Sequence, residues 1–235
     1  MRLINFQLLM KVSLVSHTVA CDEEGLEKIV TPTDLIAFCA RVSNPSNQYN
    51  METAEKLIAY LIKWKHWSPF EMVNATLEIE TPRDIARQIL RHRSFTFQEF
   101  SQRYADPTKD LSFTFREPRL QDMKNRQNSI ETDDTVLRNA WVEVQGEVMS
   151  AAERAYKWAI DNGIAKEVAR AVLPEGLTMS RMYVNGTLRS WIHYIETRTH
   201  ISTQKEHREV AMACAKALAE IFPLINNFSQ NDEGV

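Results

Sequence analysis

The stretch MVNATLEIETPRDIARQILRHR, residues 72–93, changes its hydrophobic period once, and this change decides the fold class. Every second residue from Val73 to Ile79 is apolar, which predicts a strand with one buried face. Thr81 and Pro82 have the pattern of a cap and a first-turn proline, so IARQILRHR is expected to form a helix directly after the strand. This strand and helix in succession are the first indication of an α+β chain.

The segments on either side carry the same two periods. Thr31, Pro32 and Asp34 form a second helix start, and Thr203 with Glu206 has the spacing of a capping box. Polar residues dominate 104–132, which is expected to be a long exposed excursion with at most a short strand at SFTF. The other expected elements are a half-buried strand within residues 6–20 and helices at about 32–42, 51–65, 133–162, 165–173, 187–199 and 203–222. We therefore expect one helix-rich α+β domain over residues 1–235, with a small antiparallel sheet flanked by helices.

Composition and charge exclude several classes of protein. The 235 residues are 44% hydrophobic and 25% charged, as in soluble globular proteins, and no stretch approaches the ~20 apolar residues of a membrane span. The first twenty residues lack the unbroken apolar core of a signal peptide, so we expect a cytoplasmic protein. A net charge of −3 argues against a surface built to bind nucleic acid. The three scattered cysteines form no CxxC pair, and packing is their expected role.

Residues 83–103 depart from this balance, because they contain five arginines and no lysine. A guanidinium can hold a phosphate or a carboxylate with two hydrogen bonds, so an anionic ligand is expected here. The six glycines form neither GxGxxG nor the GxxxxGK[ST] loop. The phosphates of any bound nucleotide must therefore be held by arginines and helix N-termini.

The densest part of this region is RHRSFTFQEFSQRY, residues 91–104, in which aromatic residues lie between the arginines. Arg87, Gln88 and Arg91 have the spacing of one helix face and are expected to point at one ligand. Past the helix, four alternating residues are expected on one side of an extended segment: Arg93, Glu99, Ser101 and Arg103.

Two other interpretations of this cluster stay open at this point. It could be a solvated helix with surface salt bridges, or an RNA-binding or single-strand-binding module without catalysis. The net charge and the absence of an RNA-binding signature weigh against the second interpretation.

Five motifs in a fixed order place the cluster in a family pattern. They are HWSPFE at 66–71, ARQILRHR followed after seven residues by Ser101 and Arg103, KEVARAVLP at 166–174, TLRSWIHYIETR at 187–198, and Gln204 within TQKEHREVA. In this order they resemble the flavin-dependent thymidylate synthases, and the resemblance covers about residues 6–225.

The resemblance implies a methyltransferase that makes dTMP from dUMP, takes the one-carbon unit from methylenetetrahydrofolate and uses FAD reduced by NADPH as the hydride source. It also implies a homotetramer of α+β subunits whose active sites are shared between chains. Neither a nucleic acid nor a membrane is expected as a partner. FAD and dUMP together bring three phosphates, which agrees with a chain that offers arginines without glycine-rich loops.

The resemblance also implies site residues by their position in the motifs. The implied flavin contacts are Ser68, Arg91, His92, Arg93, Glu99, Thr187, Leu188, Arg189 and His193, with Asn185 as an alternative to Thr187. The implied dUMP contacts are Gln88, Arg91, Glu99, Ser101, Gln102, Arg103, Arg170 and Arg198, with His66 near the folate and the flavin ring.

By its position in the motifs that carry the resemblance, Arg198 is the expected catalytic residue. A guanidinium fixed beside N3 and O4 of the uracil would push electron density toward C5, so no cysteine nucleophile is needed. The cysteines Cys21, Cys39 and Cys214 lie outside every motif. No metal is expected, because His193, His200 and His207 are spaced by sevens, roughly 10 Å apart along a helix.

Overall fold

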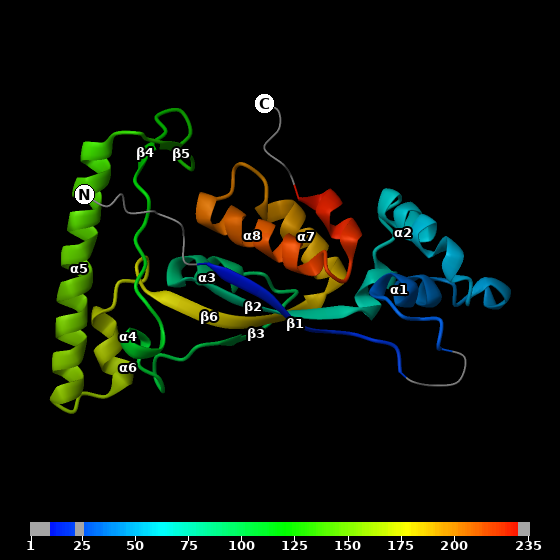
Figure 1. Cartoon of the computed structure of the whole chain (residues 1–235), viewed down its shortest axis with the longest axis horizontal. Helices are drawn as coiled ribbons and strands as arrows, with labels where there is room; N and C mark the ends of the chain where they lie inside the picture. The colour runs from blue at the N-terminus through cyan, green and yellow to red at the C-terminus, as the bar shows by residue number, and fades with distance from the viewer. Residues whose placement is uncertain (1–9, 22–25, 230–235) are drawn as a thin grey trace.

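A four-stranded antiparallel sheet lies at the centre of the computed structural model, which describes residues 10–21 and 26–229. The strand order is β1-β2-β6-β3, with β1 at Lys11–His17, β2 at Asn74–Pro82, β6 at Met179–Thr187 and β3 at Thr96–Glu99. Helices α7 (Leu188–Arg198) and α8 (Lys205–Leu218) lie over one face of this sheet (Figure 1). The predicted helix-rich α+β fold with a small antiparallel sheet is confirmed.

The inward face of β2 supplies the centre of the core. The alternating residues from Val73 to Ile79 are at most 1% exposed, as their period predicted. Leu77 lies opposite Val184 on β6, and Trp191 of α7 donates its indole N–H to the carbonyl of Ala75 at 3.0 Å. Burial of apolar surface stabilises the fold by roughly 25 cal/mol per Å², so this layer holds α7 in one register on the sheet.

Strand β6 lies between β2 and β3 and is absent from the sequence-based prediction. Its inward positions are Ser180, Met182, Val184 and Gly186, so two of the four are small or polar. A Cβ on Gly186 would lie 2.5 Å from Cε1 of Phe95, which explains why no larger residue fits there. Small and polar inward residues weaken the period-two signal on which strand prediction depends.

The elements at the N-terminal side agree with the prediction. Helix α1 (Pro32–Ala40) begins at the predicted cap, Thr31, which forms a capping box with Asp34, and α2 (Ala54–Lys63) follows a 3-10 turn at Met51–Thr53. The predicted strand within residues 6–20 is β1, and residues 6–9 of that prediction lie outside the described residues. Further 3-10 turns lie at Pro45–Asn47, Ser68–Met72, Arg170–Val172 and Pro223–Phe228.

Helix α3 (Arg83–Ile89) differs from its prediction at both ends. Thr81 belongs to β2 and caps nothing; its hydroxyl is buried without a hydrogen-bond partner in the described part of the chain. The first N–H of the helix, that of Arg83, instead donates to the carbonyl of Thr178 at 2.9 Å. Because the helix ends at Ile89, Arg91 lies in the following turn, and the predicted shared helix face with Arg87 is wrong.

The segment between β3 and β6 forms a separate group of elements around a long helix. This group lies at one end of the sheet, and α1 and α2 lie at the other end (Figure 1). Helix α5 (Thr135–Asp161) is capped by Asp134 and ends before Gly163, whose φ is 76°. The predicted strand at SFTF is reduced to one bridge between Phe113 and Thr178, and the predicted excursion contains a hairpin instead. The remaining elements are α4 (Pro107–Asp110), β4 (Arg119–Gln121), β5 (Ser129–Glu131) and α6 (Lys166–Ala169).

The N-terminus of α8 also differs from the prediction. Gln204 is the N-cap, and the predicted capping box is wrong, because the hydroxyl of Thr203 donates to the carbonyl of Thr197 instead. The carboxylate of Glu206 is held by arginines of a distant segment, which a local pattern cannot reveal. None of the helices in the described residues is both long enough and apolar enough to cross a membrane.

Candidate active site

Arg198 lies at the end of α7 and contacts the turn after α3. Its Nε donates to Nε2 of His92 at 3.0 Å. Burial, and then the positive charge of Arg198, lowers the pKa of His92 from its ordinary value of 6.5 to about 4. The imidazole is therefore neutral at pH 7, and it holds the guanidinium without cancelling its charge.

A second buried imidazole continues this group of side chains. His207, on α8, is 0% exposed, with Nε2 3.2 Å from the hydroxyl of Tyr194 and Nδ1 3.1 Å from Oε1 of Gln88. Burial, and then the charge of Arg198, lowers its pKa to about 3, and burial raises the pKa of Tyr194. Both groups are therefore neutral at pH 7. We call Gln88, His92, Tyr194, Arg198 and His207 the neutral network.

A second group of side chains near β3 is held by ion pairs. Glu99 accepts from the hydroxyl of Ser180 at 2.8 Å and lies 3.5 Å from a guanidinium nitrogen of both Arg83 and Arg87. Glu175 contacts the same two arginines at 3.5 and 3.3 Å. We call these residues the ion-paired cluster.

The turn after β3 brings two more predicted dUMP contacts together. Arg103 is paired with Glu167 at 3.2 Å, and Nε of Arg170 donates to the carbonyl of Glu167 at 3.2 Å. Gln102 is 4% exposed, and its Nε2 has no hydrogen-bond partner in the described residues. Since β3 ends at Glu99, Ser101 lies in a turn, and the predicted extended alternation through Ser101 and Arg103 is wrong.

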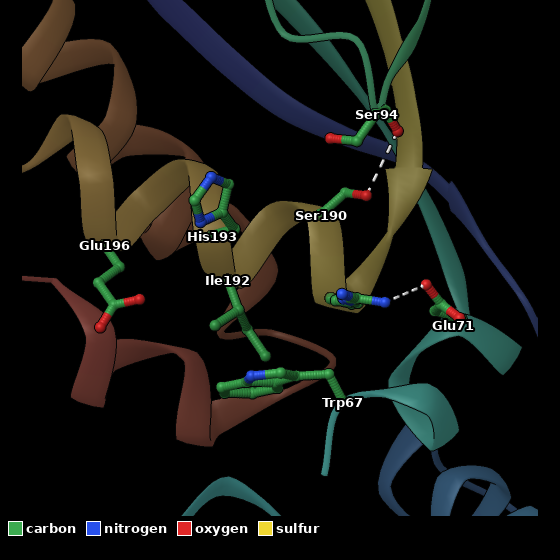
Figure 2. Close-up of a pocket in the computed structure, with 8 residues that line it drawn as sticks. Trp67, Glu71, Ser94, Ser190, Ile192, His193 and Glu196 are labelled. Atoms are coloured by element: carbon green, nitrogen blue, oxygen red, sulfur yellow. Dashed lines mark hydrogen bonds and ion pairs between the residues drawn. The ribbon is translucent and has the colours of Figure 1, made fainter. Parts of the chain in front are cut away.

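A cavity of about 470 Å³ opens at the start of α7. Figure 2 shows His193, Ser190 and Glu196 projecting from α7, with the ring of Trp67 beneath Ile192. Arg189 also lines this cavity and is paired with Glu71 at 2.6 Å, and Ser94 contributes through its carbonyl, which accepts from Ser190 Oγ at 3.3 Å. Arg189 and His193, both predicted flavin contacts, are thus brought to one cavity.

Other predicted flavin contacts have structural roles of their own. Thr187 caps α7 by accepting from the N–H of Ser190 at 3.1 Å, and Asn185 donates to Thr76 Oγ1 at 2.9 Å. Leu188 is 0% exposed, so its side chain belongs to the core. His66 and Ser68 are exposed in the segment before β2 that also supplies Trp67 to the cavity.

Free positive charge is the feature that fits this site to phosphates. Within the described residues, four of the predicted site arginines form no ion pair: Arg91, Arg93, Arg170 and Arg198. Arg91 and Arg93 are exposed, and Arg170 and Arg198 are half-buried, so all four guanidinium groups can reach an anionic ligand and hold it with paired hydrogen bonds. The residues present therefore fit a flavin dinucleotide and a nucleoside monophosphate.

The comparisons with known proteins agree with this chemistry. The family model described as "Thymidylate synthase complementing protein" matches residues 26–224. A probable flavin-dependent thymidylate synthase of Paramecium bursaria Chlorella virus 1 is 47% identical over 216 residues, which are 92% of this chain and 97% of the relative. The chain belongs to the flavin-dependent thymidylate synthase family. All the predicted site residues lie within the matched range.

Two further proteins are similar to this chain over most of its length. A flavin-dependent thymidylate synthase of Synechocystis sp. is 46% identical over 214 residues, covering 91% of this chain and 95% of the relative. Among solved structures, the UMP/dUMP methylase PolB from Streptomyces cacaoi bound with 5-Br UMP is similar with a TM-score of 0.77. Its sequence identity is 26%, over 94% of this chain and 95% of that chain.

Sequence analysis missed several side chains around the site of this family member. Tyr194, His207, Glu175 and Glu206 are absent from the predicted contacts, although each touches one or is linked to one by a single residue. His207 gave a local signal, as a histidine on an apolar helix face. Its partners are not local, because Gln88 lies more than one hundred residues away and Tyr194 lies on the neighbouring helix α7. Only the folded chain reveals these pairs.

Proposed function

We propose that this chain catalyses the flavin-dependent reductive methylation of dUMP to dTMP, with methylenetetrahydrofolate as the one-carbon donor and NADPH as the reductant of FAD. Membership of the family supports the reaction class. The observation that carries the proposal is the Arg198–His92 hydrogen bond of 3.0 Å, which holds a guanidinium in place while leaving its charge unneutralised. Such a charge suits the stabilisation of an anionic uracil ring.

The cavity at the start of α7 is the proposed flavin side. Arg189 and His193 line it, and Arg91 and Arg93 lie just before Ser94, another lining residue. When bound, FAD supplies hydride chemistry, which no side chain of the protein can provide. The protein's own contribution is to hold the phosphates through guanidinium groups and to exclude water with Trp67 and Ile192.

The neutral network and the ion-paired cluster form the proposed dUMP side. Gln88 and Arg198 face the uracil, while the ion-paired cluster with Arg103 and Arg170 binds the ribose and phosphate. The phosphate oxygens then take over the contact of Glu175 with Arg87 and the contact of Glu167 with Arg103. Arg198 stabilises negative charge on N3 and O4 as C5 becomes nucleophilic, and neutral His92 keeps that guanidinium in position.

The proposed assembly is a homotetramer with active sites shared between chains. Helix α5 carries an exposed apolar stripe at spacings of four, three and four residues, made by Leu137, Trp141, Val144 and Val148. A second copy of the chain would cover this stripe, since monomers rarely expose such faces. Sharing also gives Arg91 and Arg93 a ligand from a neighbouring site.

The first test is the spectrum and activity of the purified protein. We expect it to be yellow, or to become yellow with added FAD, and to form dTMP only when dUMP, methylenetetrahydrofolate and NADPH are all present. A protein that binds no FAD would contradict the proposal. Light scattering tests the assembly separately: a fully active monomer at micromolar concentration would contradict the tetramer.

A further inference from the structure

A buried carboxylate at the first turn of α8 lies next to the proposed site and belongs to none of the predicted contacts. Glu206 is 3% exposed. Its Oε1 lies 2.7 Å from Arg119 and its Oε2 lies 3.3 Å from Arg116. Burial by itself raises the pKa of Glu206, but the two arginines outweigh burial and the pKa falls below its ordinary value. The group is therefore ionised and can only accept hydrogen bonds.

This acceptor fixes the orientation of two side-chain amides. Because Glu206 cannot donate, Gln204 must turn its Nε2 toward Oε2 of Glu206, at 3.0 Å. Its Oε1 then accepts from Nε2 of Gln88 at 2.8 Å. The carboxamide of Gln88 is left with Oε1 facing Nδ1 of His207 at 3.1 Å.

The same logic fixes the tautomer of His207. Its low pKa makes the ring neutral, so one nitrogen carries the proton and the other accepts. Since Oε1 of Gln88 can only accept, Nδ1 of His207 must carry the proton. Nε2 then accepts from the hydroxyl of Tyr194 at 3.2 Å.

We propose that Glu206 is a positioning residue that sets the direction of a hydrogen-bond relay through Gln204, Gln88 and His207 to Tyr194. The relay presents the Gln88 carboxamide to the substrate in one of its two orientations. The effect on dUMP rests on the proposed function, whereas the direction of the relay does not.

The segment that holds Glu206 gives the relay a fixed starting point. Arg119 lies on β4, and Arg116 also pairs with Asp84 of α3 at 2.9 Å. Both arginines can only donate hydrogen bonds. If a donor group replaced either carboxylate oxygen of Glu206, one arginine would lose its acceptor. An exposed amide such as Gln204 would otherwise turn freely, because its two orientations have similar energy in water.

The variant Glu206→Gln tests the direction of the relay, because its side-chain amide places a hydrogen-bond donor where the relay begins. Its Oε1 keeps the shorter contact with Arg119, so its amide nitrogen faces Gln204. Gln204 and Gln88 must both turn over, and Nδ1 of His207 becomes the acceptor. We expect the proton of His207 to move from Nδ1 to Nε2, which donates to Tyr194.

The direct test uses ¹⁵N-histidine labelling and long-range ¹H–¹⁵N spectra of the full chain at pH 7, with His207 assigned by His207→Gln. We expect an Nδ1–H tautomer in the wild type and an Nε2–H tautomer in Glu206→Gln. Asp84→Asn is the matched control, because it removes the other carboxylate of Arg116 without touching Gln204; it should retain Nδ1–H. An Nε2–H tautomer in the wild type, or no change in Glu206→Gln, would overturn the proposal.

Kinetics supply a second test, whose first variant does not depend on the folding of Glu206→Gln. Gln204→Leu cuts the relay at an exposed residue and leaves the Glu206 contacts with both arginines in place. We expect the KM for dUMP to rise about 10-fold with kcat changed less, as for loss of one well-placed hydrogen bond. If Glu206 acts through Gln204, adding Glu206→Gln to Gln204→Leu raises KM no further.

The two tests separate the relay from the reaction. If the KM of the double variant rose by the product of the two single effects, the two residues would act independently, and the relay would be contradicted even in an active enzyme. Absence of dTMP formation by the wild type would contradict the proposed function, while the His207 tautomers would still decide the direction of the relay.

Discussion

The neutral network and the ion-paired cluster hold their arginines in opposite ways. In the neutral network, Arg198 donates to an uncharged imidazole at 3.0 Å. In the ion-paired cluster, Arg83 and Arg87 share two carboxylates, Glu99 and Glu175. A guanidinium beside a neutral acceptor keeps its charge for a developing anion, whereas one beside a carboxylate is oriented but largely neutralised. This difference is why we propose chemistry at the first region and ligand binding at the second.

Arg198→Lys should produce the largest effect, because it removes the planar donor from the neutral network while retaining its charge. We expect FAD binding and NADPH oxidation to persist while dTMP formation falls by at least ~100-fold. Product formation by chromatography and flavin absorbance would be measured on the same sample.

The control for this variant is Arg181→Lys. Arg181 lies on β6, pairs with Glu80 of β2 and belongs to neither region. Near wild-type dTMP formation in Arg198→Lys would show that Arg198 only interacts with the helix dipole and that the uracil is activated elsewhere.

Glu99→Gln and Glu175→Gln compare two carboxylates on the same arginines. The Glu99 side chain is 17% exposed and also accepts from Ser180, whereas that of Glu175 is 56% exposed. We expect Glu99→Gln to raise the KM for dUMP about 10-fold and Glu175→Gln to change it less than about 3-fold. Equal effects of the two substitutions in steady-state kinetics would mean that burial of the pair is irrelevant to binding.

Acid should destabilise the neutral network and the ion pairs of Glu206 in different pH windows. The pKa values of His92 and His207 are lowered from 6.5 to about 4 and about 3 in the folded chain. The unfolded chain therefore binds protons first, and the stability from neutral histidines, complete above pH 6.5, is lost as the pH falls toward 4. The pKa of Glu206 is lowered too, so its contribution is lost only below about pH 4.5.

Chemical unfolding between pH 7 and 4 measures this difference. The free energy of unfolding should fall less steeply for His207→Gln than for the wild type, and His200→Gln, at an exposed position, should follow the wild type. Identical slopes for all three proteins would show that His207 takes up its proton equally in the folded and the unfolded chain.

Replacing the cysteines should have the smallest effect. Cys214 is buried, and burial raises the pKa of its thiol, as it does for Cys39; Cys21 is exposed. A buried neutral thiol is a poor nucleophile, so the variant Cys21→Ser, Cys39→Ser, Cys214→Ala should keep turnover within about 3-fold. Circular dichroism would verify folding, and lost turnover in a folded variant would point to covalent catalysis by a thiolate.

The sequence predicts the elements with strong local signals and misses those that depend on distant partners. The alternation around Leu77, the cap of α1 at Thr31 and the length of α5 are all local, and the structure confirms them. Strand β6 was missed because two of its inward positions are not apolar. Ser180 donates to Glu99, and Gly186 lies against the ring of Phe95, where a side chain would not fit.

The same reasoning explains which site residues could be predicted. Arg198, His92 and Gln88 lie in motifs that the family resemblance supplies, so they were found without knowledge of their contacts. Glu206 was interpreted as half of a capping box, because its partner Arg119 lies 87 residues away. Its ion pair joins segments whose proximity no short pattern encodes.

The two junctions between strand and helix restrict how the chain length can vary. Arg83 follows β2 and Leu188 follows β6 without a loop, and their N–H groups donate to carbonyls just outside the opposite strand, Thr178 and Val73. One inserted residue at either junction would rotate the helix by roughly 100° and displace every side chain it carries. Insertions and deletions should therefore be tolerated in the exposed turn between β4 and β5, and be lethal to activity at either junction.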